Sequence, residues 1–534
     1  MTEPHILTID LGTSGPKAAV VSRTGRIAGS AQARLALRFT DDGGVEQDPE
    51  EVWSTCLDSA TRALAASGVD AGDVVAVVPS SQYSSIVPVD AGGRPLADMV
   101  LWMDGRGAAK KLARLPGGPS RDSPAALLHW VRVHGLAPLG GGMSLTHMRW
   151  FRFARPEVYD RTAAFLEPMD YLALRLTGRA TANQSTAYMM LLTDNRTLGA
   201  TDWDEGLLAR SHIDRDRLPE LVAAGSEVGP LLPDVAEALG LAPSTPVLSG
   251  INDTQAGAVA AGAFQGAGAG LAVGTTAVIA AHVARKKTDP RTTLFTVPSP
   301  LGDTYLVTAE NGVAGVDVDH FLDQLVYPDD ALAAGPRPDD AYAALEAAAA
   351  AASPGAGRVL FLPWLKGSLA PTVDGKVRGG FLNVGLGTTR QDLTRALFEG
   401  IALNARRLKG PVESFSGRDI AAFTFYGGGA RSDLWAQVMA DVLRVPVRQL
   451  DEPSHANSLG AGLFGLVHLG LVDVDDVAGI PRVRGVYEPD PDLEELYGER
   501  AEAFAEAFRR TRPLFHRLNR RPGTPPTWRQ RLGR

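Results

Sequence analysis

Short apolar runs separated by glycine turns dominate the first thirty residues of the chain. Residues 5–10, 18–22 and 27–31 are mainly apolar, and Gly12 and Gly15 lie in the first of the turns between them. Apolar runs of this length that are bounded by glycine are typical of strands joined by tight turns. The pattern therefore predicts three neighbouring antiparallel strands, which begin a sheet.

Apolar residues spaced three and four positions apart mark the first expected helix, residues 49–67. This spacing is typical of an amphipathic helix. We expect further helices at residues 170–177, where Gly178 stops the helix, and in the segments 254–263, 341–352, 392–404, 433–443, 457–469 and 493–515, with a helical region from residue 144 to beyond 159. Apolar runs at 74–78, 86–89, 271–273, 278–281, 305–308 and 422–426 predict strands.

One short pattern occurs twice, about 260 residues apart. Residues 9–15 read IDLGTSG and residues 271–277 read LAVGTTA, and each run leads into a second apolar strand. Similar units so far apart suggest two related domains that face each other. Only the first copy carries an aspartate, Asp10, where the second has Ala272.

The length of 534 residues is too large for one ordinary core, so two large domains are expected. We divide the chain into residues 1–248, residues 249–480, and a C-terminal helix with a basic tail, residues 481–534, in which nine arginines fall between Arg509 and Arg534. We interpret this tail as a solvated and partly disordered terminus, because no aromatic interleaving or repeat accompanies its charges.

Charge and composition narrow the range of partners. The net charge of −8 gives no general attraction to nucleic acid. We find no apolar run long enough to span a bilayer and no leader pattern at the start, so we expect no membrane partner. The single cysteine, Cys56, excludes an intrachain disulfide framework and fits a reducing compartment. We expect a soluble, cytoplasmic protein, and a homodimer stays open.

The segment from 249 to 276 carries the strongest chemical signal. Asp253 stands where the alanine-rich helix begins, close to the Gly-Thr-Thr turn of the second repeat. A carboxylate that can take a proton, beside donors that can hold phosphate, suits phosphoryl transfer. The alternative is that Asp253 only caps its helix. The second repeat favours the first interpretation, because two phosphate-holding turns with one carboxylate, Asp10, match a nucleotide with one magnesium ion.

Three weaker signals have structural alternatives. Trp102, Asp104 and Arg106 could stack on a sugar and bind its hydroxyls, or could be a core Trp with an exposed ion pair. Lys17 could reach a phosphate, or could be a solvated surface lysine. A strand at 422–426, followed by a glycine turn and a helix, lets a backbone approach a nucleotide closely.

Taken together, these motifs resemble the FGGY carbohydrate kinases over roughly residues 6–470. Residues 10–20 resemble the first phosphate turn of that family. Residues 142–151 are similar to its first signature, with His147 in place of lysine. Residues 378–399 are similar to its second signature, with Asn383 in place of glycine, and residues 427–443 resemble its adenosine-binding turn and helix.

The resemblance implies an α/β fold of two actin-like, ribonuclease H-like ATPase domains with a cleft between them, and it implies ATP and Mg²⁺ as cofactors. By position, Asp253 matches the catalytic base and Asp10 the carboxylate near magnesium. The expected nucleotide-binding residues are Thr13, Ser14, Lys17, Gly274, Thr275, Gly429 and Asp433. The expected substrate-binding residues are Gln82, Tyr83, Ser84, Trp102, Asp104 and Arg106.

The expected function is ATP-dependent phosphorylation of a sugar or polyol hydroxyl. Residues 82–85 read Gln-Tyr-Ser-Ser, where xylulokinases have Gln-Met-His-Gly and glycerol kinases begin Gln-Arg-Glu. The segment 102–106 is more like the xylulokinase branch, which favours a ketopentose-like substrate. The alternatives are a nucleotide-switched interaction protein of the same fold and a sugar-binding protein that has lost catalysis. Asp10, Asp253 and the cluster at 102–106 argue against both.

Overall fold

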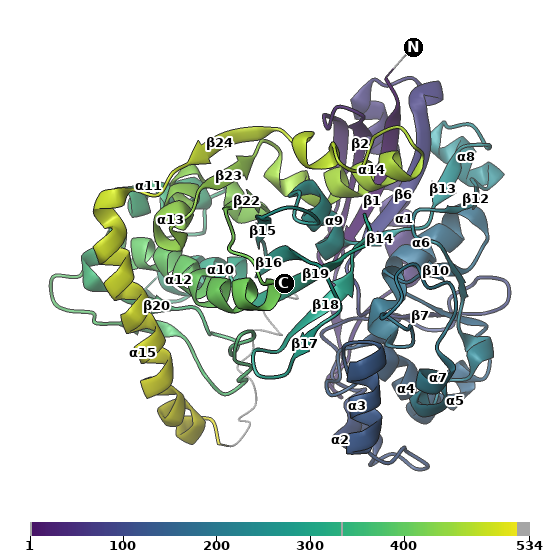
Figure 1. Ribbon diagram of the computed structural model, residues 1–534, viewed down its shortest axis with the longest axis horizontal. Coiled ribbons are helices and arrows are strands. Elements are labelled where there is room, and N and C mark those ends of the chain that lie inside the picture. The colour runs from purple at the N-terminus through teal and green to yellow at the C-terminus, as the bar shows by residue number, and fades with distance from the viewer. Residues whose placement is uncertain (1–2, 333–334, 521–534) are drawn as a thin grey trace.

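The computed structural model describes residues 3–332 and 335–520 of the chain, so the end of the basic tail lies outside the described residues. Two lobes lie side by side, each built around one large sheet (Figure 1). We call the lobe built on the first sheet the N-lobe and the lobe built on the second sheet the C-lobe. The fold is α/β, as the sequence predicts.

The sheet of the N-lobe begins with the three antiparallel strands that the sequence predicts. Its strand order is β12-β13-β6-β1-β2-β3, and β14 also pairs with β6. Strand β1 runs antiparallel to β2 and parallel to β6. The bounds are β1 His5–Gly12, β2 Gly15–Ser22, β3 Ile27–Gln32, β6 Val74–Ser81, β12 Glu227–Pro230, β13 Pro246–Leu248 and β14 Ile251–Asn252.

The sheet of the C-lobe has eight strands in the order β17-β18-β19-β16-β15-β22-β23-β24. Strand β15 runs antiparallel to β16 and parallel to β22. The bounds are β15 Gly268–Val273, β16 Thr276–Val283, β17 Thr288–Asp289, β18 Leu294–Pro298, β19 Tyr305–Val313, β22 Ala422–Tyr426, β23 Val447–Leu450 and β24 Val483–Tyr487.

The two sheets share a central arrangement. In each, a hairpin (β1–β2 or β15–β16) is flanked on one side by an antiparallel strand, β3 or β19, and on the other by a parallel strand, β6 or β22. The repeated Gly-Thr segments are the turns of these two hairpins. The sequence repeat therefore reflects two related sheets.

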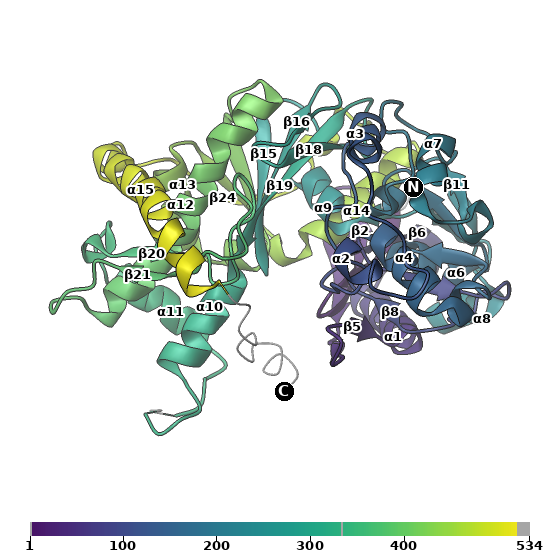
Figure 2. The same ribbon diagram turned by 90° about the horizontal axis from the view of Figure 1, so that it is seen from below.

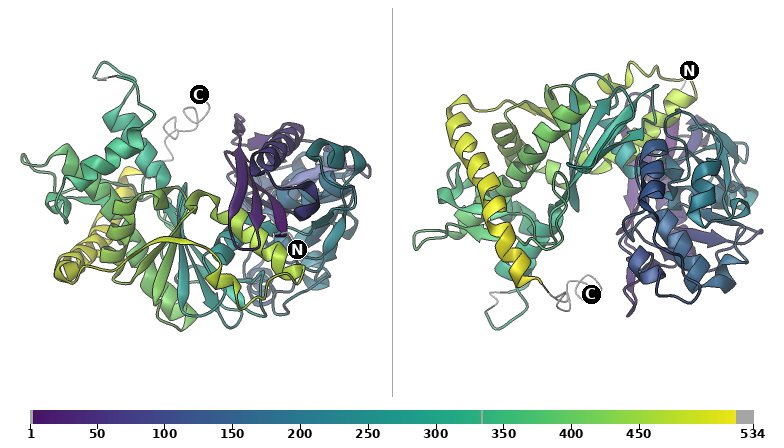
Figure 3. Two further views of the ribbon diagram at one scale, coloured as in Figure 1. Left: turned by 90° about the horizontal axis from the view of Figure 1, so that it is seen from above. Right: turned by 60° about the horizontal axis from the view of Figure 1, so that its bottom comes forward.

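Helices α9 (Asp253–Ala260) and α14 (Ala456–His468) pack against each other between the two sheets. Small residues permit this contact, because a Cβ atom at Gly460 would lie 1.8 Å from the carbonyl oxygen of Ala256. One buried cluster joins residues of both lobes, including Val21 and Val78 of the N-lobe sheet. Figure 3 shows α14 beside the strands of the N-lobe. The helix pair thus connects the lobes at the base of both hairpins.

The remaining long helices cover the sheets. Helix α1 (Pro49–Ser67) has the predicted bounds, because Asp48 caps its start and Gly68 adopts a left-handed conformation at its end. Helix α12 (Arg390–Ser416) is longer than predicted and contains Pro411. The other bounds are α3 Pro124–Val133, α4 Ser144–Ala154, α5 Pro156–Tyr159, α6 Pro168–Thr177, α7 Glu205–Ser211, α8 Pro233–Leu239, α10 Gly315–Phe321, α11 Ala341–Ala350, α13 Asp433–Leu443 and α15 Glu494–Leu518.

Short elements complete the lobes. Strand β8 (Met99–Val100) ends before Trp102, so this side chain lies in a turn. The others are α2 Ala109–Leu112, β4 Arg38–Phe39, β5 Val45–Gln47, β7 Val87–Val89, β9 Ala164–Leu166, β10 Thr181–Asn183, β11 Glu220–Val222, β20 Leu360–Leu362 and β21 Gly380–Leu382. Within the described ranges, no helix is both long and apolar enough to cross a membrane.

Helix α15 lies on the side of the C-lobe away from the N-lobe (Figures 1 and 2). Its Phe504 and Phe508 rings lie 5.2 and 4.8 Å from the ring of Trp364, measured between centroids. Tyr497 on the same helix is fully buried. The C-terminal helix is thus part of the core of the C-lobe.

Candidate active site

Asp253 is the first residue of α9, but it does not cap the helix. The side chain of the preceding residue, Asn252, accepts a hydrogen bond from the Gln255 N–H at 2.9 Å and is the N-cap. The Asp253 carboxylate instead accepts the Thr254 N–H at 2.6 Å and the Thr254 hydroxyl at 3.2 Å. Asn252 is therefore the N-cap of α9, and the Asp253 carboxylate adds one further hydrogen bond to the first turn, from the Thr254 N–H.

The surroundings of Asp253 tune it toward base chemistry at neutral pH. Burial, and after it the charge of Asp10, raises the pKa of Asp253 to about 7. Glu310 adds a smaller contribution in the same direction, and the Thr254 hydrogen bonds oppose it. A general base works best when its pKa lies near the working pH. Asp253 has this property.

Asp10 connects the first hairpin to the helix pair. It lies on β1, directly across from Lys17 on β2. Its buried carboxylate accepts the Ser80 hydroxyl at 3.0 Å. Burial raises the pKa of Asp10, whereas Lys17, Ser80 and Asn457 lower it. Asn457 belongs to α14, and no sequence motif indicates that its amide lies beside Asp10.

Few protein groups near Asp10 could hold a metal ion by themselves. In residues 3–332 and 335–520, there is no group of three or more His, Cys, Asp or Glu side chains arranged to hold a metal. Magnesium, however, usually takes one or two carboxylates, keeps several waters and binds the phosphates of a nucleotide. The buried Asp10 carboxylate, with Asp253 nearby, fits a magnesium ion of this kind better than a resident metal.

Thr13, Gln82 and Trp102 meet at the tip of the first hairpin. The indole Nε1 of Trp102 donates to the Thr13 hydroxyl at 3.0 Å. That hydroxyl in turn donates to the side-chain oxygen of Gln82. Two residues predicted to bind substrate therefore contact one predicted to bind the nucleotide. Ser14, next in the same turn, is exposed.

Two buried side chains, His147 and Glu167, form hydrogen bonds with the backbone of residues 82–85. Ser84 adopts a left-handed conformation, with φ of 62°. Its carbonyl lies 3.2 Å from Nε2 of His147, and Glu167 accepts the Ser85 N–H at 3.2 Å. Burial lowers the pKa of His147 to about 4, so its ring is neutral at pH 7. His147, which departs from the lysine of the family signature, thus contacts the segment that we expect to determine substrate choice.

The Tyr83 side chain lies close to Asp253. Burial raises the pKa of Tyr83, and the charges of Asp253 and Glu310 raise it further. The phenol also interacts with the Thr254 hydroxyl. Tyr83 therefore stays a neutral phenol beside the carboxylate of Asp253.

Asp104 and Arg106 form a buried ion pair. The guanidinium of Arg106 lies 2.7 Å from Asp104 and 2.6 Å from Glu46, and its carbon lies 3.9 Å from the centroid of the Trp150 ring. Asp104 also accepts the Val45 N–H at 3.1 Å. The structural alternative expected an exposed pair, whereas both side chains are buried. Their polar atoms bind each other and the strand β5 beside them.

The two glycine turns of the C-lobe lie against each other. A Cβ atom at Gly429 would lie 2.7 Å from the side chain of Val273, the residue before the turn at Gly274 and Thr275. A Cβ atom at Gly427 would likewise lie 2.6 Å from the carbonyl oxygen of Val273. Only glycine allows these contacts, so the glycine run between β22 and α13 places its backbone beside the second hairpin turn.

Asp433 begins α13 at the edge of this region. Its carboxylate accepts from Nε2 of Gln449 at 3.0 Å and lies 3.2 Å from the guanidinium of Arg484. The helix cap is Ser432, whose side chain accepts the Trp435 N–H at 3.0 Å. About half of the Asp433 side-chain surface is exposed, at 53%. It is therefore accessible from solvent, next to the glycine turn.

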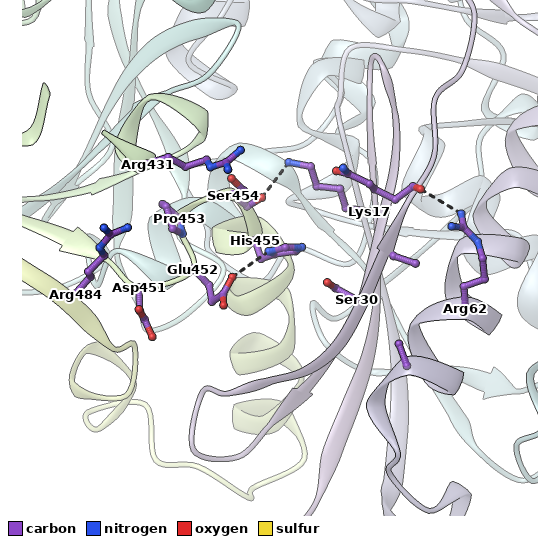
Figure 4. A pocket seen from close by; sticks show the side chains of 13 residues that line it. Lys17, Ser30, Arg62, Arg431, Asp451, Glu452, Pro453, Ser454, His455 and Arg484 are labelled. Atoms are coloured by element: carbon purple, nitrogen blue, oxygen red, sulfur yellow. Dashed lines mark hydrogen bonds and ion pairs between the residues drawn. The ribbon is translucent and has the colours of Figure 1, made fainter. Parts of the chain in front are cut away.

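A cavity of about 870 Å³ opens between the lobes. Lys17, Ser30 and Arg62 line it from the N-lobe, and Arg431, Asp451, Glu452, Ser454, His455 and Arg484 line it from the C-lobe (Figure 4). Lys17 crosses the gap and donates to the Ser454 carbonyl at 2.9 Å. Four cationic side chains face two carboxylates, so the lining favours an anion. Arg431 connects the cavity to the glycine turn.

Two charged residues that the sequence analysis did not single out approach Trp102 and Tyr83. The ammonium group of Lys366 lies 5.7 Å from the centroid of the Trp102 ring. Lys366 also lowers the pKa of Glu310, which burial raises. Lys366 directly precedes Gly367, in a segment for which the sequence analysis predicts no function.

The chain matches the model of the N-terminal domain of the FGGY family of carbohydrate kinases over residues 5–260. It matches the model of the C-terminal domain of that family over residues 269–469. The chain belongs to the FGGY family of carbohydrate kinases. The resemblance stated from the motifs is confirmed, and this FGGY kinase is a sugar kinase.

Its curated relatives carry several substrate names. The FGGY kinase is 27% identical to a xylulose kinase of Staphylococcus epidermidis, over 96% of its own length and 98% of the relative. It is 25% identical to a gluconokinase of Bacillus licheniformis, over 97% and 96% of the two chains. It is 28% identical to a glycerol kinase of Bordetella parapertussis, over 91% and 92%. These relatives support sugar or polyol kinase chemistry without selecting one substrate.

Solved structures show the same two-domain fold. The gluconate kinase of Lactobacillus acidophilus superimposes with a TM-score of 0.82 at 22% identity, covering 97% of the FGGY kinase and all of that chain. A xyloylose kinase from Brucella ovis gives a TM-score of 0.80 at 25% identity, covering 96% and 99%. The expectation of two actin-like ATPase domains is therefore confirmed.

Proposed function

We propose that this FGGY kinase transfers the γ-phosphoryl group of ATP to a hydroxyl of a ketopentose-like sugar, with Asp253 as the general base. One observation carries the proposal. Asp253 has its pKa raised to about 7 and leaves the capping of α9 to Asn252. A buried carboxylate of this kind, at the junction of two actin-like lobes, suits the deprotonation of an alcohol.

In the proposed reaction, Asp253 accepts the proton of the sugar hydroxyl as its oxygen attacks the γ-phosphorus. The bond from that phosphorus to the β–γ bridging oxygen breaks, and ADP leaves with the electron pair. Charge spreads over the transferred phosphoryl group in such a transition state. Preorganised donors stabilise this charge, and we assign that role to the turns that contain Ser14 and Thr275.

Asp10 is the proposed contact of this chain with magnesium. Mg²⁺ bound to the nucleotide would neutralise charge that develops on the phosphates. The neighbouring Ser80 hydroxyl and the Asn457 side chain hold the Asp10 carboxylate in place. Asp10 also has a second effect, because its charge keeps the pKa of Asp253 high.

We assign the nucleotide to the C-lobe turns and the adjoining cavity. Gly274, Thr275 and Gly429 lie where the two glycine turns meet, and Asp433 follows. The cationic lining that includes Lys17 and Arg431 suits phosphate groups. Lys17 donates to the Ser454 carbonyl, and we expect it to exchange this acceptor for a phosphate oxygen.

The proposed sugar site lies between Trp102, Gln82 and Tyr83 of the N-lobe and Lys366 and Glu310 of the C-lobe. Trp102 offers a half-buried ring on which a sugar face could stack. Tyr83 replaces the charged pair found in glycerol kinases with a neutral phenol, so a small triol loses its strongest partners. A ketopentose-like sugar is therefore favoured over glycerol. Asp104 and Arg106 support this site by fixing the turn that carries Trp102.

Measuring ADP release with a panel of ketoses, aldoses, aldonates and polyols tests the proposal. We expect turnover with at least one ketose, and a lower kcat/KM for glycerol. ATP hydrolysis that no sugar accelerates would instead indicate a nucleotide-switched protein. Sugar binding without turnover would indicate a protein that has lost catalysis. Either of these results would overturn the proposed function.

A further inference from the structure

Two consecutive hydrogen bonds join Trp102, Thr13 and Gln82. The indole N–H of Trp102 can only donate, because indole has no acceptor. It donates to the Thr13 hydroxyl at 3.0 Å, so this hydroxyl acts as acceptor toward Trp102. The single proton of Thr13 is then given to Oε1 of Gln82. The chain of donors runs from Trp102 through Thr13 to Gln82.

This direction decides how the Gln82 amide is oriented. Its oxygen faces Thr13, so its Nε2 group is at the other end of the amide. The backbone of both residues is fixed as well, because the Gln82 N–H donates to the Leu11 carbonyl at 2.8 Å and Gln47 donates to the Thr13 carbonyl at 3.1 Å. The Gln82 side chain cannot exchange its two ends without reversing the Thr13 bond, because Nε2 would then donate to the Thr13 hydroxyl.

Nε2 of Gln82 is a buried donor without a partner among the described residues. The residue is only 4% exposed. A buried donor left without an acceptor has lost its hydrogen bond to water without a replacement, so such groups normally serve a ligand or a functional constraint. Trp102, which starts the same hydrogen-bond chain, lies beside Lys366 of the other lobe, where we place the sugar. An oxygen of the substrate is the acceptor that Gln82 requires.

We infer that Thr13 is a positioning residue for the sugar, because its hydroxyl orients Gln82 so that Nε2 donates to a carbonyl or hydroxyl oxygen of the substrate. The inference rests on the proposed kinase function. It gives the Thr13 side chain a role distinct from phosphate binding. The Thr13 hydroxyl donates its only proton to Gln82, so it has no proton to donate to a phosphate oxygen.

Steady-state kinetics of Thr13→Val, with the sugar and ATP varied separately, test the inference. Valine keeps the shape but removes the hydroxyl, so we expect the KM for the sugar to rise about tenfold, the size of one hydrogen bond, while the KM for ATP stays within about twofold. Thr13→Ser retains a hydroxyl and should keep the wild-type sugar KM. Thr275→Val is the matched control in the second hairpin turn, and it should raise the KM for ATP and not for the sugar.

A double-mutant cycle with Gln82→Ala separates a role through Gln82 from a general structural role. If Thr13 acts through Gln82, Thr13→Val should add nothing to the rise in sugar KM in the Gln82→Ala background. Additive effects, or a Thr13→Val enzyme with a changed KM for ATP alone, would overturn the inference while leaving the kinase function intact. A wild-type protein inactive on the whole sugar panel would overturn the proposed function and this inference with it.

Discussion

The Asp10 carboxylate raises the pKa of Asp253 across the junction of the two lobes, in addition to the larger effect of burial. Asp10 lies on β1 and Asp253 at the start of α9, so a residue far away in the sequence helps to set the charge state of Asp253. The same pair contains the one carboxylate that we place near magnesium and the one that we propose as the base.

Replacing Asp253 by Asn should remove the base and keep the shape of the side chain. We expect kcat to fall by ~10²–10⁴-fold, with ATP affinity nearly unchanged. Asp475→Asn, an exposed carboxylate far from the site in sequence, is the control and should keep full activity. If folded Asp253→Asn retained more than about a tenth of the rate, Asp253 would not be the base.

The pH dependence of kcat/KM should report the ionisation of Asp253. The base must be ionised, and burial and Asp10 raise its pKa to about 7, so kcat/KM should rise with pH up to about 7 and then level off. Asp10→Asn removes a charge that raises this pKa, so the inflection should move to lower pH in the residual activity. An inflection near 4 in the wild-type enzyme would contradict the assignment.

The raised pKa of Asp253 also has a consequence for stability. The folded state holds its proton more tightly than the unfolded chain, so the free energy of unfolding should fall as pH rises from about 4 to about 7. Asp253→Asn removes the ionisable carboxyl and with it the loss of stability at high pH. The variant should therefore unfold at a higher temperature than wild type at pH 8 but not at pH 4. Thermal melts at the two pH values measure the difference. An equal shift at both would indicate a change in packing.

Much of the fold could be predicted because local patterns and tertiary structure agree. Helix α1 has the expected bounds because a cap, a leading proline and a left-handed glycine all lie in its own sequence. The Gly-Thr repeat correctly indicated two related sheets. Helix α12 was predicted to end at residue 404, but it continues to Ser416 and passes Pro411, where packing of the buried positions 412 and 415 outweighs the tendency of proline to end a helix.

The candidate site could be predicted only where a motif carries it. Asp10, Thr13 and Asp253 lie in motifs and were found. Asn457, Glu310 and Lys366 were not, because a lone polar residue in a helix, strand or loop has no local signature, and only the packing of the lobes brings it to Asp10, Tyr83 or Trp102. Asn252 is a further case, since sequence alone does not show which of two neighbouring residues caps α9.

Asp10→Ala should weaken the productive arrangement of magnesium and ATP. We expect a lower rate at saturating sugar and a higher magnesium concentration for half-maximal activity, because Asp10 has no counterpart at Ala272 in the second hairpin. Lys17→Ala is the comparison and should have a smaller effect, since Lys17 donates to a main-chain carbonyl of the C-lobe. Unchanged magnesium dependence in Asp10→Ala would remove Asp10 from the metal site.

Helix α15 lies beyond the range that matches the family models, yet the C-lobe should depend on it. Phe504 is 1% exposed and packs against Trp364, so Phe504→Ala should lower the free energy of unfolding by about 3–5 kcal/mol. Leu518→Ala, at a residue that is 69% exposed near the end of the same helix, should change it little. Urea unfolding of both variants measures the difference. Equal, small effects would show that α15 is not part of the core.

Substrate choice should depend on Tyr83 and Ser84, which replace the Met-His of xylulokinases. Tyr83 is a neutral phenol beside Asp253 and the Thr254 hydroxyl, while the Ser84 carbonyl is held by His147. A site built to bind one hydroxyl discriminates by up to ~10⁴–10⁵-fold against a ligand that lacks it. We therefore expect D-xylulose to be a modest substrate and glycerol a poor one.

Changing Tyr83-Ser84 to Met-His should raise kcat/KM for D-xylulose and leave the KM for ATP unchanged, because the substituted side chains lie toward the sugar and not in the C-lobe turns. Ser84 needs attention in the design, since its φ of 62° is uncommon for residues other than glycine. Tyr83→Met alone, which leaves this backbone untouched, is therefore measured beside the double variant. If neither variant changes kcat/KM for any sugar, residues 82–85 only support the fold, and specificity must come from Trp102, Glu310 and Lys366.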